Sequence, residues 1–272
     1  MRMNKKIGFI GCGNMGQAMI GGIVKSGITL PENIMVSDKN ESFLNKVKEQ
    51  FGVLTTVDNK EVASFSDIII LAVKPNIYGN VIKEISSSVK EEVVVVTIAA
   101  GISIDFVERA FGRDMKVIRT MPNTPALVGE GMSALSKNCR VSDEELSEVL
   151  SIFQSFGEAE VIDEKLMDSI PAISGSSPAY VFMMIEALAD GAVLRGMPRD
   201  KAYKFAAQAV YGSAKMVLET GEHPGALKDK VCSPGGTTIE AVYSLEMYNF
   251  RGTIISAMES CTKKAIEMSN NN

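Results

Sequence analysis

Three glycines near the amino terminus have the spacing of a dinucleotide-binding turn. Gly11, Gly13 and Gly16 follow an apolar run at residues 7–10 in the order G-x-G-x-x-G, and helical periodicity begins directly after them. In such a turn the first glycine permits a sharp bend, the second lets a pyrophosphate approach the backbone, and the third lets the helix pack against the sheet. The N–H groups that open the helix face the phosphates. The motif therefore predicts a site for a nicotinamide dinucleotide.

An acidic residue lies at the distance that this motif requires. Asp38 follows the apolar residues 34–36 and stands 22 positions beyond Gly16. In dinucleotide-binding folds an acid about 20 residues past the glycines binds the ribose hydroxyls. The strand before the glycines, the helix after them and this acid together favour coenzyme binding over the alternative, a tight turn in some other α/β protein.

A second stretch with chemical potential lies late in the chain, at residues 231–241. Its Ser-Pro-Gly-Gly sequence at 233–236 predicts a loop, and Thr237 and Thr238 open a helix. Backbone N–H groups at such a helix start form a cradle for an anion, which suits a carboxylate. A well-capped helix start is the alternative, and the sequence alone does not choose between the two.

Three predicted strands end in turns that hold functional residue types: Lys74-Pro75-Asn76, Ala99-Ala100-Gly101 and Met121-Pro122-Asn123-Thr124-Pro125. Parallel strands bring such turns to one edge of a sheet, where ligands bind. We expect these turns to form the floor of the coenzyme site. For Lys74 the position favours a phosphate or ribose contact over an exposed strand-end charge.

Alternating strands and helices over the first half predict a Rossmann-type doubly wound parallel sheet in residues 1–163. The expected strands are 7–10, 34–37, 53–57, 67–73, 93–98, 117–120, 132–136 and 159–162, with helices including 41–50 and 143–156. Residues 164–272 have helical periodicity throughout. The helix from Ala179 is apolar nearly all round, which requires burial on every side. A second subunit supplies that burial most easily, so we expect an all-helical dimerisation domain and an obligate oligomer.

Composition excludes several classes of partner. The net charge of −5 without a basic run argues against nucleic acid and anionic membranes. No apolar run is expected to reach the ~18 residues of a membrane span, and the first strand begins too early for a signal peptide. Cys12, Cys139, Cys232 and Cys261 are scattered, and the chain has one histidine, so neither disulfides nor a metal site is expected. The expected location is cytoplasmic.

At this point the chain resembles a known family, the pyrroline-5-carboxylate reductases of proline biosynthesis. The similarity covers nearly the whole chain and is carried by five segments: IGFIGCGNMG, LAVKP, MPNTPALVGEG, SGSSPAYVF and HPGALKDKVCSPGGTTIEAV. The resemblance implies reduction of the cyclic imine Δ1-pyrroline-5-carboxylate to L-proline by hydride transfer from NADPH or NADH. It also implies a Rossmann domain, a homodimer formed through the helical domain and assembly of dimers into a decamer.

The resemblance also assigns residues to the two ligands. Those implied to contact the coenzyme are Gly11, Cys12, Gly13, Asn14, Met15, Gly16, Ser37, Asp38, Lys39, Asn59, Ala72, Val73, Lys74, Pro75, Ala99, Ala100 and Gly101. Those implied to bind the substrate are Glu164, Ser233, Gly236, Thr237 and Thr238. Thr238 is implied to act in catalysis beside the ring nitrogen of the substrate. The 233–238 loop is implied to bind the substrate carboxylate. An acid at position 38 disfavours a 2′-phosphate whereas Lys39 and Asn40 favour one, so the choice between NADH and NADPH stays open.

The residues present suit an imine better than a ketone. Ketone reduction needs a proton donor, and the one histidine, His223, is expected to be an exposed turn residue. A cyclic imine arrives protonated and accepts hydride directly, so orientation is the main requirement. One alternative is a β-hydroxyacid dehydrogenase, but residues 178–190 lack the lysine that those enzymes place there. Another is a non-catalytic NAD(P) sensor, against which only the 233–238 loop argues.

Overall fold

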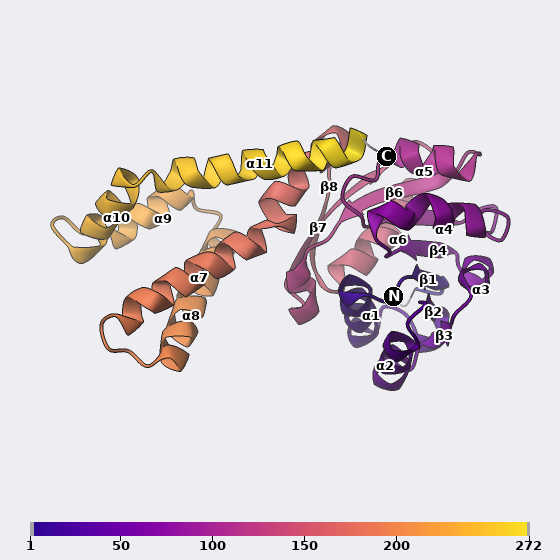
Figure 1. Ribbon diagram of the computed structural model, residues 1–272, viewed down its shortest axis with the longest axis horizontal. Coiled ribbons are helices and arrows are strands. Elements are labelled where there is room, and N and C mark those ends of the chain that lie inside the picture. Colours follow the sequence, from indigo (N-terminus) through magenta and orange to yellow (C-terminus); the bar gives the residue numbers. More distant parts are fainter. Residues whose placement is uncertain (1–2, 271–272) are drawn as a thin grey trace. The chain divides into compact units, whose positions relative to one another are not determined.

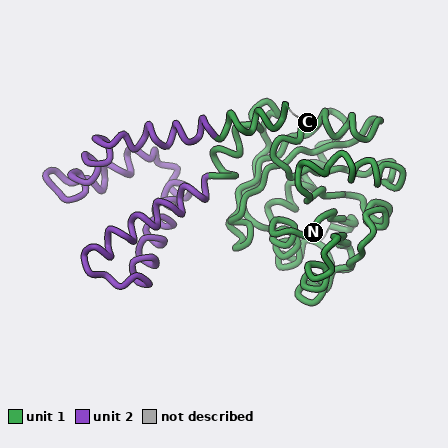
Figure 2. Tube along the Cα trace, in the orientation of Figure 1, with its two compact units in different colours: residues 1–176, 261–272 green, residues 177–260 purple. Residues whose placement is uncertain are grey.

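The structure is a computed structural model that describes residues 3–270 (Figure 1). The chain divides into two compact units (Figure 2). Unit 1 comprises residues 1–176 and 261–272, and unit 2 comprises residues 177–260. The division differs from the expected boundary after residue 163, because residues 164–176 and the end of the last helix pack with the first unit.

Unit 1 is built on one eight-stranded sheet with the order β3-β2-β1-β4-β5-β6-β7-β8. Its strands are β1 (Ile7–Ile10), β2 (Ile34–Ser37), β3 (Leu54–Thr56), β4 (Ile68–Leu71), β5 (Val94–Thr97), β6 (Lys116–Met121), β7 (Gly131–Lys137) and β8 (Gly157–Val161). The Rossmann-type parallel sheet is confirmed, with one exception that the sequence did not reveal. β7 runs antiparallel to β6, because the short connection through η3 (Thr124–Val128) contains no helical crossover.

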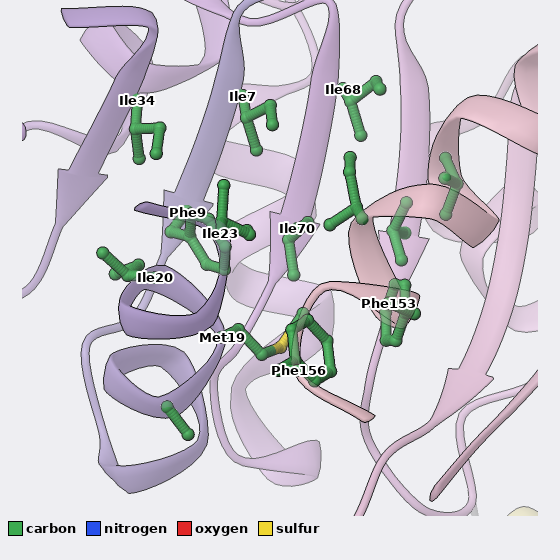
Figure 3. Close-up of a cluster of buried hydrophobic side chains, with 14 of the residues drawn as sticks. Ile7, Phe9, Met19, Ile20, Ile23, Ile34, Ile68, Ile70, Phe153 and Phe156 are labelled. Carbon is green, nitrogen blue, oxygen red and sulfur yellow. The ribbon is translucent and has the colours of Figure 1, made fainter. Parts of the chain in front are cut away.

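Helices cover both faces of this sheet. They are α1 (Asn14–Ser26), α2 (Glu41–Phe51), α3 (Asn59–Phe65), α4 (Tyr78–Ile85), α5 (Ile104–Phe111) and α6 (Asp143–Gln154). One core cluster joins the sheet to α1, α2 and α6, and includes Ile23 and Phe153 (Figure 3). A second cluster joins the other face to α3, α4 and α5. Burial on both faces explains why β4 and β5 are continuous apolar runs.

Three further segments of unit 1 follow β8 in the chain. η4 (Glu164–Ser169) and the π-helical η5 (Pro171–Gly175) follow β8. The end of α11 (Phe250–Asn270) packs on the turn after β5, where a Cβ at Gly101 would lie 3.1 Å from the Met268 carbonyl carbon. Ser269 Oγ also donates to Asp168 Oδ1 at 2.9 Å. These contacts hold the end of α11 within unit 1.

Unit 2 is entirely helical, as expected. It contains α7 (Ser177–Val193), α8 (Arg199–Thr220), α9 (Pro224–Val231), α10 (Thr237–Met247) and the start of α11. α7 and α8 pack side by side (Figure 1). The residues that unit 2 buries are Ala189, Ala202 and Ala206, whereas Phe182 is 63% exposed. The chain alone therefore does not provide the burial that the apolar α7 requires.

The segment Pro171–Val193 is long and apolar enough to cross a membrane by length and composition, with a mean hydropathy of 1.2. The segment includes Glu186 and Asp190, so it meets this criterion as an average over a window and not as an uninterrupted apolar run. Length and composition are weak grounds for a membrane span, because a helix that a partner subunit covers has the same properties.

Candidate functional site

The glycine-rich turn lies where the strand order reverses, between β1 and β4. Gly11 has a φ of +101°, and a Cβ there would collide with the Ala72 carbonyl oxygen. A Cβ at Gly16 would lie 2.8 Å from the Gly11 carbonyl oxygen, whereas one at Gly13 would meet no atom within 4 Å. The open approach at Gly13, beside the first turn of α1, fits a pyrophosphate. Asn14 and Met15 occupy that first helical turn.

Asp38 is bound to this turn through the backbone. Its Oδ2 accepts a hydrogen bond from the Cys12 N–H at 2.6 Å, and its Oδ1 accepts one from the Asn40 N–H at 2.8 Å. The Cys12 side chain is buried, and burial together with the Asp38 charge raises the pKa of its thiol to about 12. Cys12 therefore stabilises the turn through its N–H and its packing, which makes a direct coenzyme contact through either group unfavourable.

A cavity of about 240 Å³ opens beside Gly11 and brings several predicted residues together. Ser37, Asp38, Lys39, Asn59 and Val73 line it. Four further lining residues were not anticipated from the sequence: Ile77, Asn80, Val81 and Glu84. They lie on or next to α4. Including the first turns of the helix that follows the Lys74-Pro75-Asn76 turn would have predicted them.

Two of the three turns that were predicted to form the floor of the coenzyme site follow β4 and β5. Lys74 is exposed and is the N-cap residue of η2 (Pro75–Ile77). Ala99 and Ala100 follow β5, and Gly101 has a φ of +77°. These residues lie at the carboxyl ends of β4 and β5, the edge at which open α/β sheets bind ligands.

A buried tyrosine links those two turns, and sequence reasoning missed it. The Tyr78 hydroxyl donates to the Leu71 carbonyl and accepts hydrogen bonds from Thr97 Oγ1 at 3.1 Å and the Ile98 N–H at 3.4 Å. Burial raises the pKa of this phenol well above its usual value. Tyr78 thus fixes the ends of β4 and β5 relative to each other. Nothing in its sequence position distinguishes it from an ordinary aromatic core residue.

Glu164, predicted to bind substrate, is engaged within unit 1. Its Oε1 accepts the Ile104 N–H at 2.9 Å and lies 3.5 Å from Arg119 Nη1. Arg119 also pairs with Asp168 at 2.5 Å, and its side chain is buried. These bonds give Glu164 a structural role in holding η4 against the sheet and the start of α5.

On unit 2 the 233–238 loop has the form that an anion cradle needs. Gly235 has a φ of +65°, and the Gly236 N–H donates to the Ser233 carbonyl at 3.0 Å. The Gly236 N–H therefore closes the turn, and its role as a ligand donor stays a prediction. Gly236 is the N-cap residue of α10 and forms no side-chain capping hydrogen bond, so the well-capped start and the anion cradle are both compatible with this geometry. Thr237 and Thr238 supply the first N–H groups of this helix.

The His223 side chain has a structural role in unit 2. His223 is the N-cap residue of α9, where its Nδ1 accepts the Gly225 N–H at 3.0 Å. It is exposed, as the sequence predicted. Within residues 3–270 no group of three His, Cys, Asp or Glu side chains could hold a metal ion.

Comparisons with known proteins agree with this geometry. The family model described as pyrroline-5-carboxylate reductase dimerisation matches residues 164–268, and one described as coenzyme F420-dependent NADP oxidoreductase matches residues 6–101. The first match indicates that the helical unit forms a homo-oligomer.

Named relatives extend over the whole chain. A pyrroline-5-carboxylate reductase of Escherichia coli (strain K12) is 57% identical over 267 residues, covering 98% of this chain and 99% of that protein. One from Methanosarcina acetivorans is 43% identical, covering 97% of this chain and 98% of that protein. A crystal structure of the Plasmodium falciparum reductase with NADP bound has a TM-score of 0.90 at 35% identity, covering 99% of this chain and 100% of that one. On sequence, fold and site geometry, the chain belongs to the pyrroline-5-carboxylate reductase family of NAD(P)H-dependent oxidoreductases.

Proposed function

We propose that this chain reduces the C=N bond of Δ1-pyrroline-5-carboxylate to give L-proline. NAD(P)H, bound along the glycine-rich turn of unit 1, supplies the hydride. The observation that carries the proposal is the start of α10, where the N–H groups of Thr237 and Thr238 follow a glycine cap and have no side-chain partner. Backbone donors at a helix start suit the carboxylate of a small cyclic acid.

In this proposal the residues of unit 2 orient the substrate. Ser233, Thr237 and the backbone around Gly236 hold the carboxylate, and the Thr238 hydroxyl contacts the ring nitrogen. The iminium form accepts hydride without a separate proton donor, so positioning accounts for most of the rate enhancement. That His223 serves as a helix cap is consistent with this scheme.

Glu164 takes a different part from the one that the resemblance implied. Its hydrogen bond to the Ile104 N–H and its ion pair with Arg119 support a positioning role beside the Ala99–Gly101 turn. A direct contact between Glu164 and the substrate stays a prediction.

The assembly proposed is a decamer built from dimers that pair through unit 2. The exposed apolar side chains of α7 and α8 support the dimer, and the family resemblance supports the ring. Light scattering of the purified protein should give ten times the chain mass of 29.3 kDa. A stable dimer at micromolar concentration would contradict the ring alone. We also propose a cytoplasmic location, which the four free cysteines support.

The test of the reaction is coenzyme oxidation, followed at the nicotinamide absorbance. Pyrroline-5-carboxylate should consume NADH or NADPH and yield L-proline, identified by chiral chromatography. A panel of 3-hydroxy acids with the oxidised coenzymes provides the comparison. Failure to reduce the imine with either coenzyme, or turnover of a hydroxy acid instead, would overturn the proposal.

A further inference from the structure

The cavity beside Gly11 is the place where the structure bears on the choice between the two coenzymes. Its wall joins the ends of β1, β2 and β4 to α3 and α4. In this fold the region past the end of β2 receives the adenosine ribose, whose 2′ position alone distinguishes NADH from NADPH. The charges around the cavity therefore decide which of the two coenzymes fits.

Two carboxylates line this cavity, the half-buried Asp38 and the exposed Glu84. Asp38 is held by the N–H groups of Cys12 and Asn40. A carboxylate offers about four lone-pair sites, so Asp38 retains capacity for ribose hydroxyls. Glu84 Oε2 accepts a hydrogen bond from Asn59 Nδ2 at 3.0 Å.

The same asparagine connects Glu84 to the end of β2. Asn59 Oδ1 accepts a hydrogen bond from Ser37 Oγ at 2.8 Å, and both residues line the cavity. Donor and acceptor groups of Asn59 are therefore both used, which fixes its amide orientation and with it the position of the Glu84 carboxylate.

The positive charge available to a phosphate is smaller. Lys39 is the one cationic side chain among the lining residues, and no arginine is among them. A 2′-phosphate carries close to two negative charges, and its recognition in this fold uses an arginine. One exposed lysine does not offset the negative charge of two carboxylates. It also does not supply the bidentate phosphate contact of a guanidinium group.

We propose that this cavity takes an adenosine ribose with a free 2′-hydroxyl, so that the chain prefers NADH to NADPH, with Asp38 and Glu84 as the residues that determine this specificity. The proposal rests on the proposed function only in requiring a nicotinamide coenzyme. Asp38 selects for the diol by accepting its hydrogen bonds. Glu84 selects against the phosphate by repulsion.

Equilibrium binding to the full-length protein tests this without turnover. NADH and NADPH are titrated with coenzyme fluorescence as the readout, and 5′-AMP and adenosine 2′,5′-bisphosphate are titrated by calorimetry. We expect NADH to bind at least about 10-fold more tightly than NADPH at low ionic strength, and the ratio to shrink as salt rises. The fragment pair should show the same order, because the difference lies at the ribose.

Variants locate the effect. Glu84→Gln removes the charge but retains an acceptor for Asn59, so NADPH affinity should rise about 3- to 5-fold with NADH affinity unchanged. The double variant Asp38→Asn/Glu84→Gln should raise NADPH affinity further and lower NADH affinity. Glu91→Gln is the matched control, since Glu91 is exposed and precedes β5 at the opposite edge of the sheet. It should leave the ratio as in the parent.

The outcomes separate the two proposals. Equal or tighter binding of NADPH by the parent, or a ratio that Glu84→Gln does not change, overturns the specificity assignment and leaves imine reduction standing. Failure of both coenzymes and both fragments to bind overturns the proposed function, and the specificity assignment with it.

Discussion

Unit 1 and unit 2 differ in what holds them together. Unit 1 places buried side chains on both faces of its sheet, in two large clusters that include Ile7, Phe9, Tyr78 and Phe153. Unit 2 buries three alanines and leaves large apolar side chains such as Phe182 and Phe205 exposed. Because apolar burial is the main favourable term in folding, unit 1 has a core of its own. We expect unit 2 to acquire one by association, so that its folding is coupled to the assembly of the enzyme.

The division extends to function. The coenzyme turn depends on close backbone contacts within a complete core, whereas the 233–238 loop belongs to a unit that needs partner chains. Coenzyme binding should therefore survive changes that abolish assembly, and substrate turnover should not. Four experiments test this contrast, in order of expected effect.

The largest effect is expected from a charge on the exposed apolar surface of unit 2. Phe182→Asp should abolish oligomerisation and lower turnover by at least about 100-fold, since it places an unpaired charge on a surface that we expect a partner subunit to bury. Sedimentation velocity and the imine assay measure the two effects. Val57→Asp in unit 1 is the matched control, because Val57 is exposed to 64% and Phe182 to 63%. Retained assembly in Phe182→Asp would contradict the contrast between the units.

A smaller but still large effect is expected at the glycine-rich turn. Gly11→Ala combines a positive φ with a collision against the Ala72 carbonyl, so coenzyme affinity should fall about 100-fold while assembly through unit 2 persists. Calorimetric titration with the reduced coenzyme measures the loss. Gly27 also has a positive φ, +68°, but a Cβ there meets nothing within 4 Å. Gly27→Ala should cost about 1 kcal/mol of stability and leave coenzyme binding intact.

In unit 2, we expect the Thr238 hydroxyl to increase turnover by one to two orders of magnitude, the usual contribution of one positioned polar contact. Thr238→Ala should lower kcat by roughly 10- to 100-fold, with coenzyme binding and assembly unchanged. Thr253, whose Oγ1 donates to the Asn249 carbonyl near the start of α11, provides the control. If Thr238→Ala and Thr253→Ala are equally active, Thr238 has no catalytic role.

The smallest effect concerns acid stability. In unit 1, burial disfavours the charged form of Asp67, but hydrogen bonds from the Lys6 N–H and the Lys90 ammonium outweigh burial and lower the pKa of its carboxyl. The stability that ionised Asp67 contributes is therefore present above its unfolded-state pKa and is lost as pH falls through the lowered folded-state value.

Asp67→Asn should cost about 1 kcal/mol near neutral pH, and the difference from the parent should vanish at strongly acid pH. Thermal melts at several pH values measure it. In unit 2, Asp229 forms an exposed ion pair with Lys228, so Asp229→Asn should leave the melting temperature unchanged at every pH. A pH-independent loss in Asp67→Asn would show that packing, rather than charge, stabilises this part of unit 1.

The sequence predicted much of this architecture because the signals were local. The sequence pattern marked all eight strands to within two residues, including the short β3 (Leu54–Thr56). The glycine spacing located the turn after β1. Local pattern failed at β7, because strand direction depends on how the chain returns to the sheet. It failed for Tyr78 and Glu84 as well, since their partners lie 19 to 25 residues away in sequence.

Sequence alone determined the fold class, the coenzyme turn and the helix start at Thr237, because each depends on residues within a few positions of one another. Tertiary structure decided that Asp38 is held by Cys12, that Glu164 pairs with Arg119, and that Glu84 faces the same cavity as Asp38. These are charges and hydrogen bonds between residues that are brought together only when helices pack on a sheet. In our proposal, Asp38 and Glu84 among them set the coenzyme specificity of a site whose location the sequence had already predicted.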